Sequence, residues 1–217
     1  AKIITATNVF AHITEVNKLI KNIKNCLKHD GVFISESHYL LPLIETNQYD
    51  TIYHEHLRYY SLTSLNYLLS KYNLEIFKAE RIKTHGGSIR VYAARKNIYK
   101  IESSVVSIKK SEKNLEKKLY NFKVRILDSK IKFYNLLNRL YKNKKKLKIA
   151  GISAPSRSTT LINYLGLDEN IIEYIFEIKG SKKIGMYLPG TKIKIVEEKI
   201  QNLKKYYYLL IFSWHIK

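Results

Sequence analysis

Cysteine is almost absent from this sequence of 217 residues, where Cys26 stands alone. A lone cysteine excludes an internal disulfide framework and leaves no set of thiolates for a metal. No apolar run approaches the roughly 20 residues that a membrane-spanning helix needs, and no charged-then-apolar leader precedes the first strand. We therefore predict a soluble, cytoplasmic protein with no metal site and no membrane partner.

Acidic residues are also scarce, with 18 Asp and Glu against 39 Lys and Arg and a formal charge of +21. Such a charge favours an anionic partner, and nucleic acid is one candidate. The excess of lysine, together with abundant Ile, Asn and Tyr, is equally what AT-rich codon usage produces. Because no RNA-binding or DNA-binding module is recognisable, nucleic acid is the less favoured partner.

The densest group of proton-handling side chains lies in the segment YDTIYHEHLRYY at residues 49–60. It places Tyr53, Glu55 and His56 close together along the chain. His titrates near neutral pH, Glu orients or charges an imidazole, and Tyr supplies a hydroxyl donor, so the three suit proton abstraction beside a carbonyl. Two alternatives stay open: a solvated turn, and a metal site that would need ligands from elsewhere.

The first hundred residues alternate between strand and helix patterns. A strand that opens at Ala1 precedes a helix over 14–28, with Thr14 as its expected N-cap, and a buried strand follows in GVFISESHYLL. Ligands of such α/β sheets lie beyond the carboxyl ends of the strands. Asn8 to His12 and Glu36 to Tyr39 occupy those ends, so they are site candidates, against the alternative of ordinary loop polarity.

Further elements follow the histidine-rich segment. Residues 61–72 predict a helix that begins at Ser61 or Thr63, and LEIFKAERI and SIRVYAARK predict two antiparallel strands joined through THGG. Gly86 and Gly87 permit positive φ, and His85 beside them is either a turn residue or a site residue. Residues 103–146 lack proline and glycine and predict one long helix, or two joined at a kink, that links two lobes.

The second lobe opens with KLKIAGISAPSRSTTLINYLGL, a strand, a small-residue loop and a helix. Amides at such a helix start favour phosphate, Ser156 and Ser158 add hydroxyl donors, and Arg157 adds a guanidinium fork. The loop is neither a dinucleotide-binding glycine motif nor a Walker loop. Three more strands are predicted, in IIEYIFE, in the residues that lead to KIKIV, and in a buried YYYLLIFSW, and a helix is predicted over EEKIQNLKK. The lobe is therefore expected to be a second open α/β sheet.

Five segments in this order, NVFAHI, DTIYHEHLRYYSLTSL, HGGSIRVY, GISAPSRSTTLINYLGL and KIGMYLPGT, resemble the sugar C-methyltransferase family, almost from end to end of the chain. The resemblance implies the carboxyl-terminal half of a Rossmann-like methyltransferase domain (1–100), a helical linker (101–146) and a carboxyl-terminal α/β domain (147–217). It also implies S-adenosylmethionine as cofactor and a nucleotide-linked keto-deoxysugar as the small-molecule substrate.

What the resemblance implies for single residues is a methyl transfer to an enolate carbon. His56 is expected to be the base, Tyr53 and Glu55 to place the sugar or stabilise the enolate, and His12 to lie close by. The remaining expected contacts are Asn8 and Val9 for the cofactor, and Glu36, His85, Arg90, Ser153, Ser156, Arg157 and Ser158 for the substrate.

The sequence departs from the family pattern in two ways. Pro155, Ser156 and Arg157 stand where the family tends to carry a Lys-Gly pair. The glycine-rich cofactor loop, the acidic ribose-binding residue and the zinc-ligand cysteines do not occur in these residues. We therefore expect a fragment of a longer reading frame, begun inside a strand and cut after YYYLLIFSW, with little activity of its own. A non-catalytic nucleotide-sugar or anion-binding module and a basic nucleic-acid binder remain alternatives, and the oligomeric state stays open.

Overall fold

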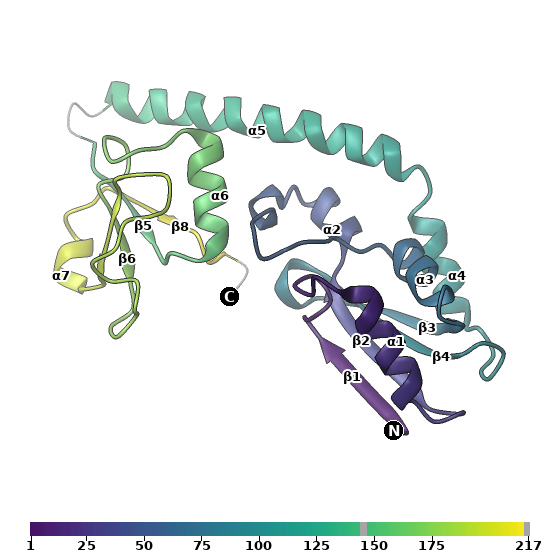
Figure 1. The fold of residues 1–217 in the computed structure, drawn as a ribbon. Helices are drawn as coiled ribbons and strands as arrows, with labels where there is room; N and C mark the ends of the chain where they lie inside the picture. The colour runs from purple at the N-terminus through teal and green to yellow at the C-terminus, as the bar shows by residue number, and fades with distance from the viewer. Residues whose placement is uncertain (144–146, 215–217) are drawn as a thin grey trace. The chain divides into compact units, whose positions relative to one another are not determined.

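The chain folds into two compact units, each built on its own sheet. The computed structural model describes residues 1–143 and 147–214. The first unit comprises Ala1–Gln48 and His54–Phe122, and the second comprises Tyr49–Tyr53 and Lys123–Lys217 (Figure 1). The α/β class with two sheets is thereby confirmed. The domain boundaries expected after residues 100 and 146 stay a prediction. The end of the expected linker (144–146) and the end of the chain (215–217) lie outside the described residues.

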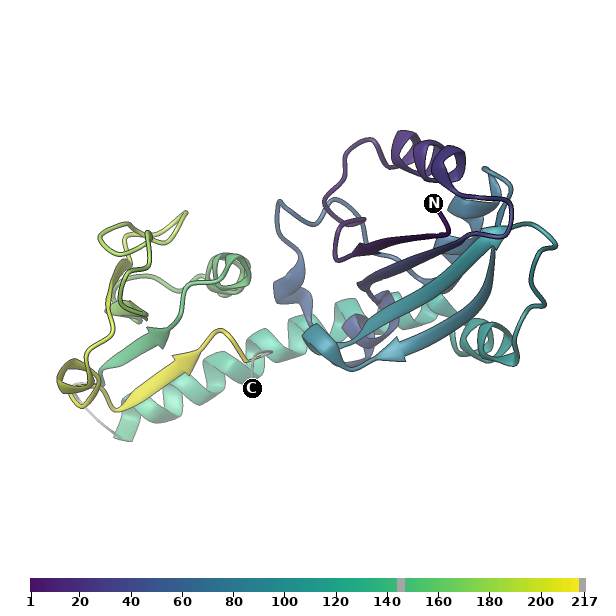
Figure 2. The ribbon, with the colours of Figure 1, turned by 90° about the horizontal axis from the view of Figure 1, so that it is seen from below.

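The first sheet has the strand order β1-β2-β4-β3, and the four strands lie side by side in Figure 2. β1 and β2 are parallel and joined by α1, as the strand, helix, strand pattern predicts. β4 pairs antiparallel with both β2 and β3, which confirms the hairpin expected around THGG. The elements are β1 (Ile3–Thr7), α1 (Val16–Cys26), β2 (Val32–His38), α2 (Leu40–Glu45), α3 (Leu62–Ser70), β3 (Leu74–Ile82) and β4 (Ser88–Arg95).

One face of this sheet carries the core of the first unit. Alternation along β2 and β4 directs Phe33 and Val91 to that face, where both are fully buried. Val16, Ile20 and Ile23 recur at helical spacing on α1 and are buried in the same cluster. The opposite alternation set, which contains Glu36 and His38, is therefore directed away from the apolar core.

The two helix starts in this unit differ in how well the sequence predicts them. Ser61 caps α3 as expected. Its hydroxyl accepts a hydrogen bond from Ser64 N, and the Ser64 hydroxyl accepts one from Ser61 N. The expectation of Thr14 as the cap of α1 is wrong, since α1 begins at Val16 with Glu15 in the cap position. Thr14 is held elsewhere, because its carbonyl accepts from the Arg58 guanidinium at 3.0 Å.

The helical stretch after residue 103 breaks once, so the alternative of two helices is confirmed. α4 (Ser103–Ser111) ends at Glu112, and α5 (Leu115–Asn143) begins after Asn114, whose φ is 58°. A left-handed residue interrupts the helical hydrogen bonds, and asparagine tolerates that conformation better than most residues. α5 is the long helix that begins in the first unit, which ends at Phe122, and continues in the second unit from Lys123.

The second sheet is parallel, with the order β7-β6-β5-β8. The strand and helix alternation of the second lobe is thus confirmed, but the expectation of a buried last strand is wrong. β8 pairs with β5 at one edge of the described sheet, and Leu209 and Ile211 on it are exposed. The elements are η1 (Tyr49–Thr51), β5 (Ile149–Ile152), α6 (Ser156–Leu165), β6 (Tyr174–Glu177), β7 (Lys194–Glu197), α7 (Ile200–Leu203) and β8 (Tyr208–Ile211).

Candidate active site

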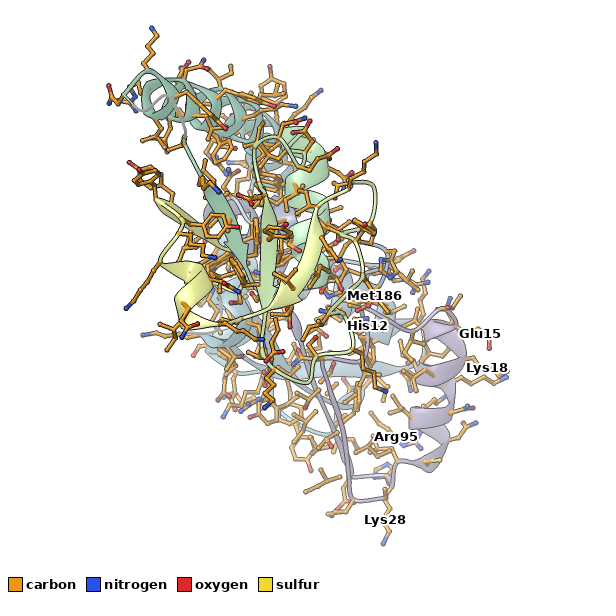
Figure 3. All side chains as sticks on the ribbon, turned by 90° about the vertical axis from the view of Figure 1, so that its left-hand side faces the viewer. His12, Glu15, Lys18, Lys28, Arg95 and Met186 are labelled. Atoms are coloured by element: carbon orange, nitrogen blue, oxygen red, sulfur yellow. The ribbon has the colours of Figure 1, made fainter. Side chains whose placement is uncertain are left out.

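The carboxyl ends of β1 and β2 lie at one edge of the first sheet, where α/β folds hold their ligands. The main-chain N–H of Asn8, just after β1, donates to the Glu36 carbonyl near the end of β2 at 2.8 Å. The chain then turns before α1, with the N–H of His12 bonded to the Val9 carbonyl at 3.0 Å. His12 consequently lies near the amino end of α1, while Lys28 lies at the other end (Figure 3).

The end of the histidine-rich segment returns to this edge through main-chain contacts. Leu57 N donates to the Ala11 carbonyl at 2.9 Å, and Arg58 donates to the carbonyls of Ile13 and Thr14. Tyr60 forms a parallel bridge with Tyr39, directly after β2. These contacts fasten residues 57–60 beside the loop that carries His12, whereas His54 and Glu55 before them form an exposed turn.

His56 lies among other aromatic and imidazole rings of this unit. Its ring centroid is 5.1 Å from that of His12, 6.2 Å from that of His38 and 5.9 Å from that of Tyr59. His56 is half-buried, whereas His12 is exposed. The predicted proximity of His12 and His56 is therefore present, and the cluster also contains His38 and Tyr59.

The tautomer of His12 follows from its hydrogen bond. Nδ1 of His12 lies 2.9 Å from the carbonyl oxygen of Glu55. A carbonyl oxygen only accepts, so Nδ1 carries the hydrogen, and in the neutral ring Nε2 is the basic nitrogen. Neutral His12 thus accepts protons or hydrogen bonds through Nε2.

Glu36 and Arg90 form an ion pair across β2 and β4. The carboxylate is buried and accepts from Arg90 Nη2 at 2.7 Å and from Nε at 3.0 Å, in line with their register. The hydrogen bond to Glu36 raises the pKa of Arg90. Thr84 also donates to this carboxylate, at 3.3 Å. Thr84 is thus the turn residue that is bonded to Glu36. His85 beside it is exposed, with a φ of 52°.

The other two residues expected around the base are placed differently from His12. The carboxylate of Glu55 lies 3.8 Å from Nε2 of His54, and the side chains of both residues are exposed. Tyr53 is half-buried and belongs to the second unit. The phenol ring beside His56 in the first unit is that of Tyr59. The roles of Tyr53 and Glu55 stay predictions.

In the second unit, the loop between β5 and α6 has its own internal partners. The N–H of Ala154 donates to the Glu177 carboxylate at 2.6 Å, and Ser158 Oγ donates to the Pro155 carbonyl at 2.7 Å. Arg157 is buried, with Nη1 3.6 Å from Asp50 Oδ2. A substrate anion at this helix start would compete with carboxylates that are already there.

The other two serines of the expected substrate pocket lie in the same loop. Ser153, with a φ of 60°, has a buried hydroxyl that makes no hydrogen bond to the described residues. Ser156 opens α6 and is half-buried. The substrate contacts expected at 153 and 156–158 stay predictions.

Within residues 1–143 and 147–214, no three His, Cys, Asp or Glu side chains are placed to hold a metal ion. None of the helices described there combines the length and the apolar character required to cross a membrane.

Gln48 and Tyr59 were not singled out from the sequence, whereas His38 lies in the range 36–39 that was expected at the site. His38 had a usable signal, because it follows Glu36 by two residues and alternation along a strand directs both to one face. Gln48 had none, since its role depends on a turn 38 residues later, where its Nε2 donates to the Gly86 carbonyl.

Comparison with known proteins identifies the family. The family model described as C-methyltransferase C-terminal domain matches residues 83–217, more than half of the chain. The chain belongs to the C-methyltransferase family. A second model, described as a methyltransferase domain, matches residues 1–79. The family expected from the five ordered segments is therefore confirmed.

A curated relative agrees with this membership. C-methyltransferase NovU of Streptomyces niveus is 29% identical over 225 residues, a match that covers 99% of this chain and 52% of NovU. The chain thus spans about half the length of the curated relative it matches.

Proposed function

We propose that the protein carrying this sequence is an S-adenosylmethionine-dependent C-methyltransferase that methylates an enolate carbon of a nucleotide-linked keto-deoxysugar. The observation that carries the proposal is the position of His56. Its half-buried ring lies near His12 and His38 at the carboxyl edge of β1 and β2. Family membership supports the methyl transfer, and a general base beside a carbonyl compound supports the carbon nucleophile.

The loop after β1 fits one edge of the cofactor. Asn8 and Val9 are exposed there, next to the turn that brings the chain to His12. An amide and an apolar side chain match the polar and apolar edges of S-adenosylmethionine, which supplies an electrophilic methyl group when bound. Asn8 and Val9 would hold that edge while His12 lines the same loop.

His56 and the residues expected to act with it would then divide the chemistry. His56 removes the proton from the carbon next to the keto group, and the electron pair of the C–H bond stays on the substrate as an enolate. Tyr53 and Glu55 would place the sugar, and the Tyr53 hydroxyl would donate to the enolate oxygen. A donor aimed at a developing oxyanion commonly lowers the activation barrier by about 3 kcal/mol.

The proposed substrate contacts are polar groups, described for each unit by itself. They are Glu36, Arg90 and His85 in the first unit, and Ser153, Ser156, Arg157 and Ser158 in the second. Arg157 already faces Asp50, so its guanidinium would bridge a diphosphate oxygen and that carboxylate. The charge of +21 favours the approach of an anionic substrate.

Deuterium exchange separates base chemistry from methyl transfer. The probe is thymidine-diphosphate-linked 4-keto-6-deoxyglucose in D₂O without S-adenosylmethionine, and the measurement is deuterium incorporation at the carbon next to the keto group. We expect His56→Ala to slow incorporation at least about 100-fold, the usual size of a general-base contribution. His29→Gln is the matched control, because His29 is exposed in the turn before β2, at the other end of that strand.

Methyl transfer is then measured by adding S-adenosylmethionine and following the mass of the sugar product. His56→Ala should abolish transfer while S-adenosylmethionine still binds in isothermal titration. A His56→Ala protein that exchanges and methylates at the wild-type rate removes His56 from the role of base. The measurements use the full-length protein that carries this sequence, and wild-type full-length protein that neither exchanges nor methylates the probe refutes the proposed substrate class.

A further inference from the structure

His38 is the last residue of β2 and takes no part in the chemistry assigned so far. Its half-buried ring lies 6.2 Å from the His56 ring, centroid to centroid. The register that pairs Glu36 with Arg90 pairs His38 with Ser88, so these four residues share the polar face of the sheet. Strand geometry therefore directs His38 toward the same edge as His56.

Gln48 fixes which nitrogen of His38 carries a hydrogen. Nε2 of Gln48 lies 2.7 Å from the Gly86 carbonyl, which only accepts, so this end of the amide is the donor. The oxygen Oε1 must then face His38, whose Nε2 lies 3.3 Å away. Gln48 is only 2% exposed, so its amide is confined in this orientation.

The chemistry of His38 follows from that orientation. Because the amide oxygen accepts, Nε2 of His38 is the donor, and Nδ1 is the basic nitrogen of the neutral ring. His12 reaches an equivalent state through the Glu55 carbonyl, with Nε2 as its basic nitrogen. Two imidazoles of defined tautomer, those of His12 and His38, therefore lie near the His56 ring.

We propose that His38 is a relay residue that takes up the proton which His56 removes from the substrate. The inference rests on the proposed function of His56. In the first step the substrate C–H proton moves to a ring nitrogen of His56, and the C–H electron pair remains on carbon. In the second step the His56 imidazolium gives one proton to Nδ1 of His38 and becomes neutral again.

The relay conserves charge and needs no further reactant. His38 becomes an imidazolium whose Nε2–H stays bonded to Gln48 Oε1, and His56 is again a neutral base. The ring centroids of His56 and His38 are 6.2 Å apart. At this separation the proton would pass through one water molecule that is hydrogen-bonded to both rings. The Glu36 carboxylate, on the same face of β2, is already paired with Arg90.

The first measurement is an NMR titration of the histidine rings in wild type, His38→Gln and His29→Gln. The groups expected to influence His38 are His12, His56, Tyr59, Glu36 and Arg90. Loss of a neighbouring imidazolium favours protonation of His56. Coulomb interaction at this separation predicts that the titration midpoint of His56 rises by about 0.5 to 1 pH unit in His38→Gln, for an effective dielectric between about 40 and 80. His29→Gln should leave it in place.

The second measurement is the pH profile of deuterium exchange into thymidine-diphosphate-linked 4-keto-6-deoxyglucose. A relay predicts that His38→Gln slows exchange about 10-fold and removes one limb of the profile, while thermal unfolding matches that of His29→Gln. A purely structural role for His38 would lower the melting temperature without changing the shape of the profile.

The outcomes are distinguishable from failure of the proposed function. Exchange in His38→Gln at the wild-type rate and with the wild-type profile overturns the relay and leaves His56 as base. If wild type does not exchange the probe, the titration decides: an unmoved His56 midpoint in His38→Gln overturns the relay, and the expected rise supports the coupling on which it depends.

Discussion

Replacing Glu112 by glutamine tests how the start of α3 is held. Glu112 lies in the break between α4 and α5 and is 6% exposed. Its Oε1 accepts from Tyr39 Oη at 2.8 Å and from Leu62 N at 2.6 Å, and its Oε2 accepts from Thr63 N at 2.9 Å and Thr63 Oγ1 at 2.5 Å. One buried carboxylate therefore satisfies four donors, two of them amides in the first turn of α3.

The magnitude follows from what glutamine keeps. Its carbonyl oxygen can serve one pair of donors, but its NH₂ group then faces the other pair. Hydrogen bonds to a charged group contribute about 1.5–3 kcal/mol each, and a negative charge at a helix amino end adds about 0.5–1 kcal/mol. With partial rearrangement of the two hydroxyls, we expect Glu112→Gln to lower the free energy of unfolding by about 3 kcal/mol.

Urea unfolding followed by far-UV circular dichroism measures this loss, and hydrogen exchange at the amides of Leu62 and Thr63 locates it. Glu116→Gln is the matched control, because Glu116 is exposed in the first turn of α5 and should cost less than about 0.5 kcal/mol. If Glu112→Gln costs no more than this control, or if the two amides exchange as in wild type, the reasoning is refuted.

Two further predictions concern other parts of the chain. Gly86→Ala should lower the free energy of unfolding in urea more than Gly180→Ala. Both glycines have positive φ (82° and 85°), but a Cβ at 86 would lie 2.6 Å from Gln48 Oε1, whereas one at 180 meets nothing within 4 Å. Equal losses would contradict the proposed confinement of Gln48. Burial raises the pKa of Tyr206 to about 12, so the fold favours the neutral phenol, and its stabilisation is complete below pH ~10 and is lost as the pH rises toward 12. The urea midpoint of Tyr206→Phe should therefore fall less than that of wild type between pH ~10 and pH ~12. An equal fall in both proteins would contradict this role of Tyr206.

Most elements of the fold were predictable because their signals are local. Val16, Ile20 and Ile23 recur at the helical period, and Ser61 with Ser64 forms a capping box readable from adjacent residues. The errors occurred where a distant residue decides. Arg58 holds the carbonyl of Thr14, 44 residues earlier, so the cap of α1 moves to Glu15. An apolar run such as that of β8 does not reveal whether the strand lies inside a sheet or at its edge.

The candidate site was predictable in its residue types but not in its pairing. Local spacing indicated His56, and the resemblance to the family implied that His12 would lie close by, as the two rings do at 5.1 Å. The carboxylate next to His56 in sequence, that of Glu55, lies instead against His54. His54 and Glu55 lie in a turn, where adjacent side chains point in different directions, so sequence neighbours are poor guides to which groups share a site.

The register of β2 with β4 is what turns the separate polar residues of the first unit into one arrangement. It sets Glu36 opposite Arg90 and His38 opposite Ser88, and the turn after β3 then presents the Gly86 carbonyl to Gln48. A slip of one residue would move Glu36 and His38 into the apolar face and break the Gln48 contact. The tautomer of His38, and with it the direction in which a proton can leave His56, therefore depends on strand pairing formed far from the histidine-rich segment.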